Sequence, residues 1–260
     1  MDKLHNGIDE YLSGNLPKAI TLLKEHINEN GYDKGSAYYH LGLCFSDLNQ
    51  LTPACENFAK ACEISPEKSM YHYKLGLIYF RLMALDKAED SLSKTISLNP
   101  EHQRSRFLLG RIYFQKGLMV ESEKKLTEVL EKSPDFADAY YHRAMALYQL
   151  GKNQEALKDL HIAIEINPDY TDALLEASKI NFEHSNFIQS AEECRAIYNK
   201  GNRSFSFIKY YLNVLSKAGI FDEFETIKSE ALILFPNNQE ILSLIRWVLF
   251  IVCRRKLNEV

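Results

Sequence analysis

Prolines recur along this chain at a fixed interval. Pro66, Pro100, Pro134 and Pro168 follow one another at steps of 34 residues, and Pro236 comes 68 residues later, which is twice that step. A period of this length is typical of an array in which each repeat is one short supersecondary unit stacked on the next. Proline ends a helix because it has no backbone N–H and its ring clashes with the preceding turn. The spacing therefore predicts a solenoid of helical repeats that are closed by prolines, with one proline missing near Asn202.

Side-chain size follows the same period. If each repeat ends two residues after its proline, repeats start at residues 35, 69, 103, 137, 171 and 205. The eighth position is mostly small: Gly42, Gly76, Gly110, Ala144, Ser178 and Leu212. The twentieth is also mostly small: Ala54, Ala88, Ser122, Ala156, Ser190 and Phe224. The twenty-fourth is mostly large: Phe58, Leu92, Leu126, Leu160, Cys194 and Lys228. This alternation predicts two closely packed antiparallel helices per repeat, and Gly117, Gly151 and Gly219 predict the turn between them.

These features resemble the tetratricopeptide repeat (TPR), a helix–turn–helix unit of 34 residues. The closest match is residues 137–168, ADAYYHRAMALYQLGKNQEALKDLHIAIEINP. The resemblance implies an all-α, right-handed superhelical α-solenoid of about seven repeats over residues 1–238. Its repeats would cover residues 1–34, 35–68, 69–102, 103–136, 137–170, 171–204 and 205–238. Residues 239–260 are expected to form a C-terminal capping helix, because the last repeat has no neighbour to cover its core face.

The sequence lacks the residue patterns of an enzyme. It contains no glycine-rich phosphate loop, no GxSxG and no HExxH, and its eight histidines are scattered without metal-ligand spacing. Cys44, Cys55 and Cys62 fall at helix positions that usually pack, which predicts buried thiols. We therefore expect a non-catalytic protein without a metal or cofactor.

Composition restricts the partner and the compartment. A formal net charge of −4 argues against nucleic acid as the partner. The first residues, MDKLHNGIDEYLSGN, show no basic segment followed by an apolar run, so no signal peptide is expected. Five cysteines without close pairs fit a reducing compartment better than a disulfide framework. We expect a cytoplasmic protein.

In proteins that resemble this one, the first helix of each repeat lines a concave groove with roughly its second, fifth, ninth and twelfth positions. The fifth position is aromatic in four successive repeats: Tyr39, Tyr73, Phe107 and Tyr141. Aromatic rings bury a large area with little loss of rotamer freedom, so this ladder suits an apolar peptide segment. The expected peptide-binding residues are Tyr39, Tyr73, Lys74, Leu77, Phe80, Arg81, Arg104, Phe107, Arg111, Phe114, Tyr141 and Met145. Packing between repeats is the alternative role for these tyrosines.

Charge along the same positions is uneven. Repeats 3 and 4 carry Lys74, Arg81, Arg104 and Arg111, whereas repeats 5 and 6 carry Asp138, Asp172, Glu176 and Glu183. This pattern predicts that the acidic part of a ligand lies over repeats 3 and 4, unless these side chains are simply solvated. A clamp for chaperone C-terminal carboxylates is not expected, since only Lys209 and Asn213 match its pattern and Leu244 stands where asparagine belongs.

The last segment is unusually apolar. Seven apolar residues, WVLFIVC, occupy positions 247–253, and residues 241–260 carry a charge of +3 from four basic residues and one acid. A capping helix should be polar on its outer face, so Trp247, Leu249 and Phe250 are expected to contact a partner or a second copy. Folding back onto the seventh repeat and lying on a membrane surface are the alternatives, since the run is too short to span a membrane.

Taken together, the sequence predicts a non-catalytic scaffold or adaptor that binds a peptide segment of a partner protein in its concave groove. Two alternatives remain open. The chain could be a structural assembly protein that self-associates through its terminal helix, or a regulatory subunit that holds an enzyme.

Overall fold

The computed structural model describes the backbone of residues 2–29 and 31–258, and the side chains of these residues as far as Val248. Throughout these residues every regular element is an α-helix and no strand is present. The helices fall into two units, Met1–Pro134 and Asp135–Val260, and each unit is described by itself. The all-α fold predicted from the repeat is confirmed.

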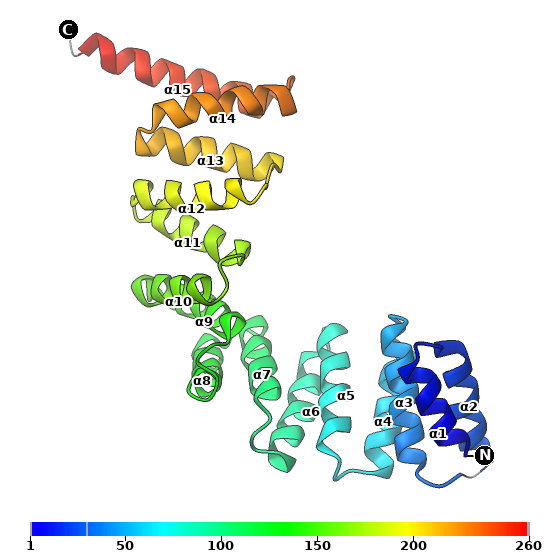
Figure 1. Cartoon of the computed structure of the whole chain (residues 1–260). Coiled ribbons are helices and arrows are strands. Elements are labelled where there is room, and N and C mark those ends of the chain that lie inside the picture. Colours follow the sequence, from blue (N-terminus) through cyan, green and yellow to red (C-terminus); the bar gives the residue numbers. More distant parts are fainter. Residues whose placement is uncertain (1, 30, 259–260) are drawn as a thin grey trace. The chain divides into compact units, whose positions relative to one another are not determined.

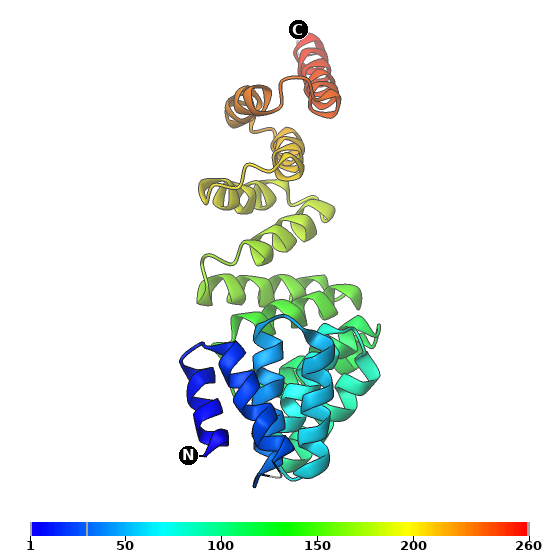
Figure 2. The same cartoon turned by 90° about the vertical axis from the view of Figure 1, so that its right-hand side faces the viewer.

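Within each unit, consecutive helices pair into hairpins and lie side by side (Figures 1 and 2). The first unit contains α1 (Lys3–Leu12), α2 (Leu16–Asn28), α3 (Lys34–Asp47), α4 (Leu51–Ile64), α5 (Ser69–Arg81), α6 (Leu85–Leu98), α7 (Gln103–Gln115) and α8 (Met119–Leu130). The second unit contains α9 (Ala137–Gln149), α10 (Asn153–Ile166), α11 (Thr171–Glu183), α12 (Phe187–Asn199), α13 (Phe205–Ala218), α14 (Phe221–Leu234) and α15 (Gln239–Asn258).

The two helices of a hairpin approach most closely where the eighth residue of a repeat faces the twenty-fourth. A Cβ atom placed on Gly42 would lie 2.7 Å from the Phe58 ring, and one placed on Gly110 would lie 2.7 Å from Leu126 Cγ. Both separations are far inside van der Waals contact, so the large partner occupies the space that glycine leaves. Phe58 and Leu126 are completely buried as a result. The predicted alternation of small and large residues is confirmed at these positions.

The turn inside each hairpin contains one residue with a left-handed backbone. Glycine takes this place in four hairpins, with φ of 82° at Gly14, 77° at Gly117, 75° at Gly151 and 73° at Gly219. Other residues take it in three more, with φ of 56° at Asn49, 59° at Met83 and 63° at Ser185. The left-handed conformation costs an ordinary L-residue roughly 1–2 kcal/mol, and glycine adopts it freely. The glycine turns are confirmed, and the structure adds that Met83 and Ser185 are strained there.

This strain leads to a prediction for the turn between α5 and α6. Met83→Gly should raise the free energy of unfolding by roughly 0.5–1 kcal/mol, because relief of backbone strain outweighs the loss of a side chain that is 62% exposed. The matched change Gly117→Ala should lower it by about 1 kcal/mol. A Cβ atom on Gly117 meets nothing within 4 Å, so only the backbone is tested there. Urea unfolding followed by circular dichroism measures both effects, and a destabilised Met83→Gly protein would contradict the strain.

The hairpin with the least regular sequence packs around large side chains. Leu212 and Phe224 stand where the repeat pattern places small residues, and both are almost completely buried. They belong to a hydrophobic cluster to which α15 contributes Ile241, Ile245 and Val248. Part of the terminal helix is therefore buried against the hairpin formed by α13 and α14.

Two of the three thiols that the repeat pattern predicts to be buried are buried. These are Cys44 and Cys62, whereas Cys55 is only half-buried. Burial raises the pKa of the Cys44 thiol to about 11 and that of Cys62 to about 12. A thiol with such a pKa is almost entirely protonated at neutral pH and is therefore a poor nucleophile.

A buried carboxylate in the second unit is surrounded by polar partners. Glu193 leaves 5% of its surface exposed and accepts hydrogen bonds from Asn181 Nδ2 at 2.9 and 3.2 Å. His161 Nε2 lies 3.2 Å from the same carboxylate. The bond to Glu193 raises the pKa of His161 above its usual value, because it favours the protonated ring.

The His161–Glu193 contact makes the stability of the second unit depend on pH. Because the folded pKa of His161 is raised, its contribution should be complete below the unfolded value of 6.5 and should disappear as pH rises through the folded pKa. The stability difference between the wild-type protein and His161→Gln should therefore be larger at about pH 5.5 than at about pH 8.5. NMR titration of the His161 ring checks the raised pKa directly. A pKa that does not fall in Glu193→Gln would refute this account.

Candidate peptide-binding face

Ten of the twelve expected peptide-binding residues belong to the first unit, on its first helices α3, α5 and α7. We call the surface that they share the first-helix face. Arg81 and Arg104 are exposed on it. The partly exposed members are Tyr39, Lys74, Leu77, Phe107, Arg111 and Phe114. Tyr73 and Phe80 are the most buried members and leave 9% of their surface exposed.

The aromatic residues of the face pack between neighbouring repeats. Tyr39 on α3 stacks on Tyr71 of the next repeat, with ring centroids 4.6 Å apart. Tyr73 on α5 packs against His102, which caps the start of α7, at 4.5 Å. Most of the surface of Tyr73 and Phe80 is used in this way, so packing accounts for these two rings better than contact with a ligand. The rings of Tyr39 and Phe107 remain partly accessible.

Arg111 on α7 lies close to two aromatic rings of the face. Its guanidinium carbon lies 4.9 Å from the centroid of the Phe80 ring and 5.8 Å from that of Phe107. Phe107 precedes Arg111 by one helical turn on α7, and Phe80 lies at the end of α5. A cation within about 6 Å of an aromatic ring is attracted by the ring's quadrupole. The two rings therefore hold the guanidinium between the third and fourth repeats.

Charge on α5 and α7 is of one sign. Their sequences, SMYHYKLGLIYFR and QRSRFLLGRIYFQ, contain five basic residues and no acidic one. Within the described residues, Lys74, Arg104 and Arg111 form no ion pair with a carboxylate. Arg81 donates to the neutral acceptors Asn49 Oδ1, at 2.8 Å, and Ser46 Oγ, at 3.3 Å. The first-helix face therefore carries positive charge that the described residues do not neutralise there.

Other basic residues of α7 and its end lie next to acids. Lys116, the residue after α7, contacts Asp86 at 2.7 Å and Glu89 at 2.8 Å. Arg106 lies 3.9 Å from Glu128 on α8. Of the cations without an acidic partner, Arg104 and Arg111 lie at the second and ninth positions of their repeat, which face a ligand in the predicted arrangement. Lys74 and Arg81 lie one residue after the fifth and twelfth positions of theirs.

Tyr141 and Met145 belong to the second unit, on α9, and both are partly exposed. Tyr141 packs against Tyr170, with ring centroids 5.1 Å apart. Burial and the neighbouring carboxylates of Glu176 and Asp172 raise the pKa of Tyr141. The acidic residues that the sequence places in repeats 5 and 6 therefore affect the pKa of Tyr141.

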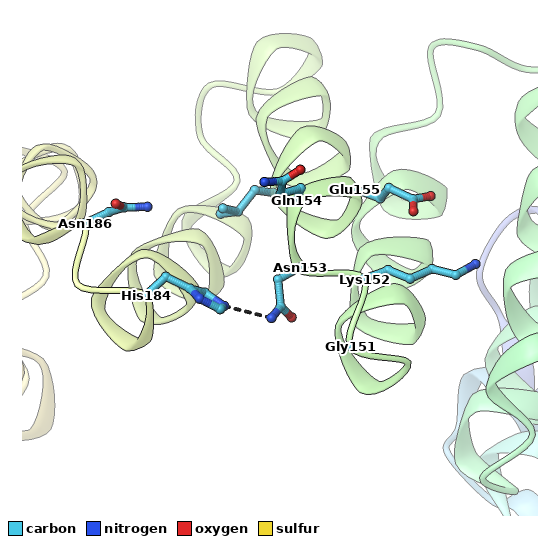
Figure 3. Close-up of a pocket in the computed structure, with 8 residues that line it drawn as sticks. Gly151, Lys152, Asn153, Gln154, Glu155, His184 and Asn186 are labelled. Carbon is cyan, nitrogen blue, oxygen red and sulfur yellow. Dashed lines mark hydrogen bonds between the residues drawn. The ribbon is translucent and has the colours of Figure 1, made fainter.

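One cavity of the second unit, of about 490 Å³, is lined by the start of α10 and by turn residues after α9 and α11. Sequence reasoning did not single out its residues: Gly151, Lys152, Asn153, Gln154, Glu155, Leu157, His184 and Asn186 (Figure 3). Asn153 Nδ2 and His184 Nε2 are 2.7 Å apart across it. Residues at turns and helix starts carry no sequence signal that separates a cavity wall from an ordinary surface.

The other cavity, of about 540 Å³, lies between α13 and α15 and is lined by Phe205, Ser206, Lys209, Tyr210, Asn213 and Leu244. It brings together the three residues that the sequence compares with a carboxylate clamp. Lys209 Nζ is already paired with the carboxylate of Glu240. Leu244 supplies an apolar wall where a clamp would need an amide, so the structure gives no support for a clamp.

The terminal helix exposes one large aromatic ring. Trp247 is 44% exposed, and Lys217 Nζ lies 5.4 Å from its ring centroid. The side chains of Leu249 and Phe250 lie outside the described residues. Among the residues that the structure describes, no helix is long and apolar enough to cross a membrane, and no group of side chains is arranged to hold a metal ion.

Helical hairpins with a small residue facing a large one, repeated every 34 residues, define a helical-repeat protein. Three profiles described as tetratricopeptide repeat match the chain, at residues 35–68, 81–148 and 137–170. The chain belongs to the TPR family. Proteins of this family generally serve as non-catalytic interaction scaffolds that bind protein or peptide partners. Comparison with curated proteins finds no matching relative.

Solved structures share the fold. The C-terminal part of a TPR repeat-containing protein from Cytophaga hutchinsonii gives a TM-score of 0.77 at 11% identity, covering 93% of this chain and 98% of that one. PilF of Pseudomonas aeruginosa gives 0.66 at 15% identity, covering 82% and 96%. YrrB, described as a TPR protein with an unusual peptide-binding site, gives 0.59 at 19% identity, covering 72% and 95%. At these identities the likeness is one of fold.

Proposed function

We propose that the first unit of this protein binds an acidic peptide segment of a partner protein on its first-helix face. The observation that carries the proposal is the charge of α5 and α7, which hold no acid and five basic residues, of which only Arg106 lies next to a carboxylate of the described residues. Unpaired charge on a protein surface steers a partner of opposite charge and fixes its orientation. The partly exposed rings of Tyr39 and Phe107 would bury the apolar side chains of the same segment. The fold shared with YrrB, which has a peptide-binding site, supports this use of the array.

The wider setting of this proposal follows from the repeat. The proposed TPR array covers residues 1–238, and the proposed C-terminal cap covers residues 239–260. A protein built in this way would act as an adaptor. A cytoplasmic location fits the buried, protonated thiols of Cys44 and Cys62. A regulatory subunit that holds an enzyme would use the same face in the same way.

Reversal of charge tests the proposal. Wild-type protein and the double variant Arg104→Glu, Arg111→Glu are compared on an array of amidated 12-residue peptides that combine acidic and apolar residues. Binding of acidic peptides should fall about tenfold at low salt and only about two- to threefold at high salt, because salt screens the attraction. Fluorescence anisotropy of the best peptide at both salt concentrations measures the difference.

The matched control is Lys94→Glu, Lys124→Glu, which makes the same change of net charge on the second helices α6 and α8, where both lysines are exposed. This control should bind within about twofold of the wild-type protein, since its charges lie off the first-helix face. If the two double variants lose the same amount of binding, net charge alone is responsible. If neither loses any at either salt concentration, the proposed function is wrong.

A second candidate function is self-assembly through α15, which the 44% exposure of Trp247 favours. A large exposed aromatic ring is enriched at protein interfaces. If α15 joins two copies, Trp247→Glu should convert a concentration-dependent dimer to a monomer in sedimentation velocity, whereas Ile233→Glu, on the 78% exposed Ile233 of α14, should not. A wild-type protein that sediments as a monomer up to about 100 μM would exclude this candidate.

A further inference from the structure

Three arginines lie over aromatic rings within the described residues. Arg143 lies 5.5 Å from the centroid of the Tyr140 ring, and Arg203 lies 3.4 Å from that of Tyr198. Arg111 lies between Phe80 and Phe107. A ring attracts the guanidinium group and restricts where it can lie.

Two of these arginines bind a carboxylate of the chain itself. Arg143 Nε and Nη2 donate to the two oxygens of Asp159 at 2.7 and 2.8 Å. Arg203 Nε donates to Glu230 Oε1 at 2.5 Å. Parallel N–H donors match the two oxygens of a carboxylate, which is why arginine prefers this partner. In this protein an arginine that lies over a ring is therefore part of a small motif of ring, guanidinium and carboxylate.

Arg111 has the ring and the guanidinium of this motif but no carboxylate. No hydrogen bond or ion pair joins its guanidinium to another described residue, although the side chain is partly buried. Its nitrogens are accessible to solvent and remain available to an acceptor from outside the chain. The two helices that carry Arg111 and its rings, α5 and α7, contain no acidic residue.

We infer that a carboxylate of the bound peptide completes the motif at Arg111. The ligand would be an acidic peptide with an internal aspartate or glutamate whose side chain accepts two hydrogen bonds from the Arg111 guanidinium. Phe80 and Phe107 hold that guanidinium in place before binding, which reduces the entropy lost on binding. Arg104 is exposed and has no ring contact, and it contributes charge without this geometry. The inference rests on the proposed function, and it names the chemical group of the ligand that the first-helix face would bind.

Replacement by lysine separates geometry from charge. Arg111→Lys keeps the positive charge but loses the planar pair of donors, and Arg104→Lys makes the same change at the exposed position. Both variants are tested with 12-residue peptides that are acetylated at the N-terminus and amidated at the C-terminus. The peptide sequence is first selected with the wild-type protein, and its central residue is then glutamate, glutamine or phosphoserine. The blocked C-terminus removes the terminal carboxylate as an alternative ligand.

Wild-type protein should prefer glutamate to glutamine by about tenfold. Arg111→Lys should reduce that preference to about threefold or less, whereas Arg104→Lys should keep it within about twofold of wild type. Circular dichroism confirms that each variant is folded, and Arg111→Gln serves as a second variant, which should lose the preference altogether.

The outcomes separate the two proposals. If wild-type protein binds no acidic peptide, the proposed function fails and this inference fails with it. If wild-type protein binds acidic peptides and folded Arg111→Lys keeps the full preference for glutamate, the proposed function stands and the assignment to Arg111 is wrong. A preference for phosphoserine over glutamate that depends on Arg111 would overturn the choice of a carboxylate as the ligand group.

Discussion

Close contact between two helices of a hairpin is the interaction on which the rest of this structure depends. Phe58 and Leu126 occupy the volume that a side chain at Gly42 or Gly110 would otherwise need. The same contact recurs in the repeat between these two, where a Cβ atom on Gly76 would lie 2.8 Å from Leu92 Cγ. A single larger residue at such a position would force the pair apart, since a Cβ atom alone would lie 2.7 Å from its neighbour.

This packing uses only part of each first helix. One side enters the hairpin and another meets the neighbouring repeat, and the remaining positions are available for function. In the first unit these positions hold aromatic rings and basic side chains. The rings serve two purposes there, because Phe80 packs in the core and also supports the guanidinium of Arg111. The same side chains that join the repeats thus position the group that we expect to contact a ligand.

Electrostatics distinguishes this surface from the rest of the chain. Arg143, Arg195 and Arg203 all find carboxylates within the second unit, where they contribute to contacts between helices. Arg111 is partly exposed, as they are, and it lies over an aromatic ring, as Arg143 and Arg203 do, yet α5 and α7 provide no acid for it. A ligand carboxylate would supply the charge partner that these helices lack.

The sequence by itself determined the repeat. A proline that ends a helix and a pattern of small and large residues at fixed spacing are local properties, so both can be recognised without knowing which residues are in contact. It also determined which side chains occupy the first-helix positions, although not their environment. Tertiary structure decided that Tyr73 and Phe80 are mostly buried, that Arg111 lies between two rings and that Lys209 is paired with Glu240. Each of these features depends on which side chain of a neighbouring helix lies within contact distance. Contact distances depend on how the helices pack and on side-chain rotamers, and the spacing of the repeats specifies neither.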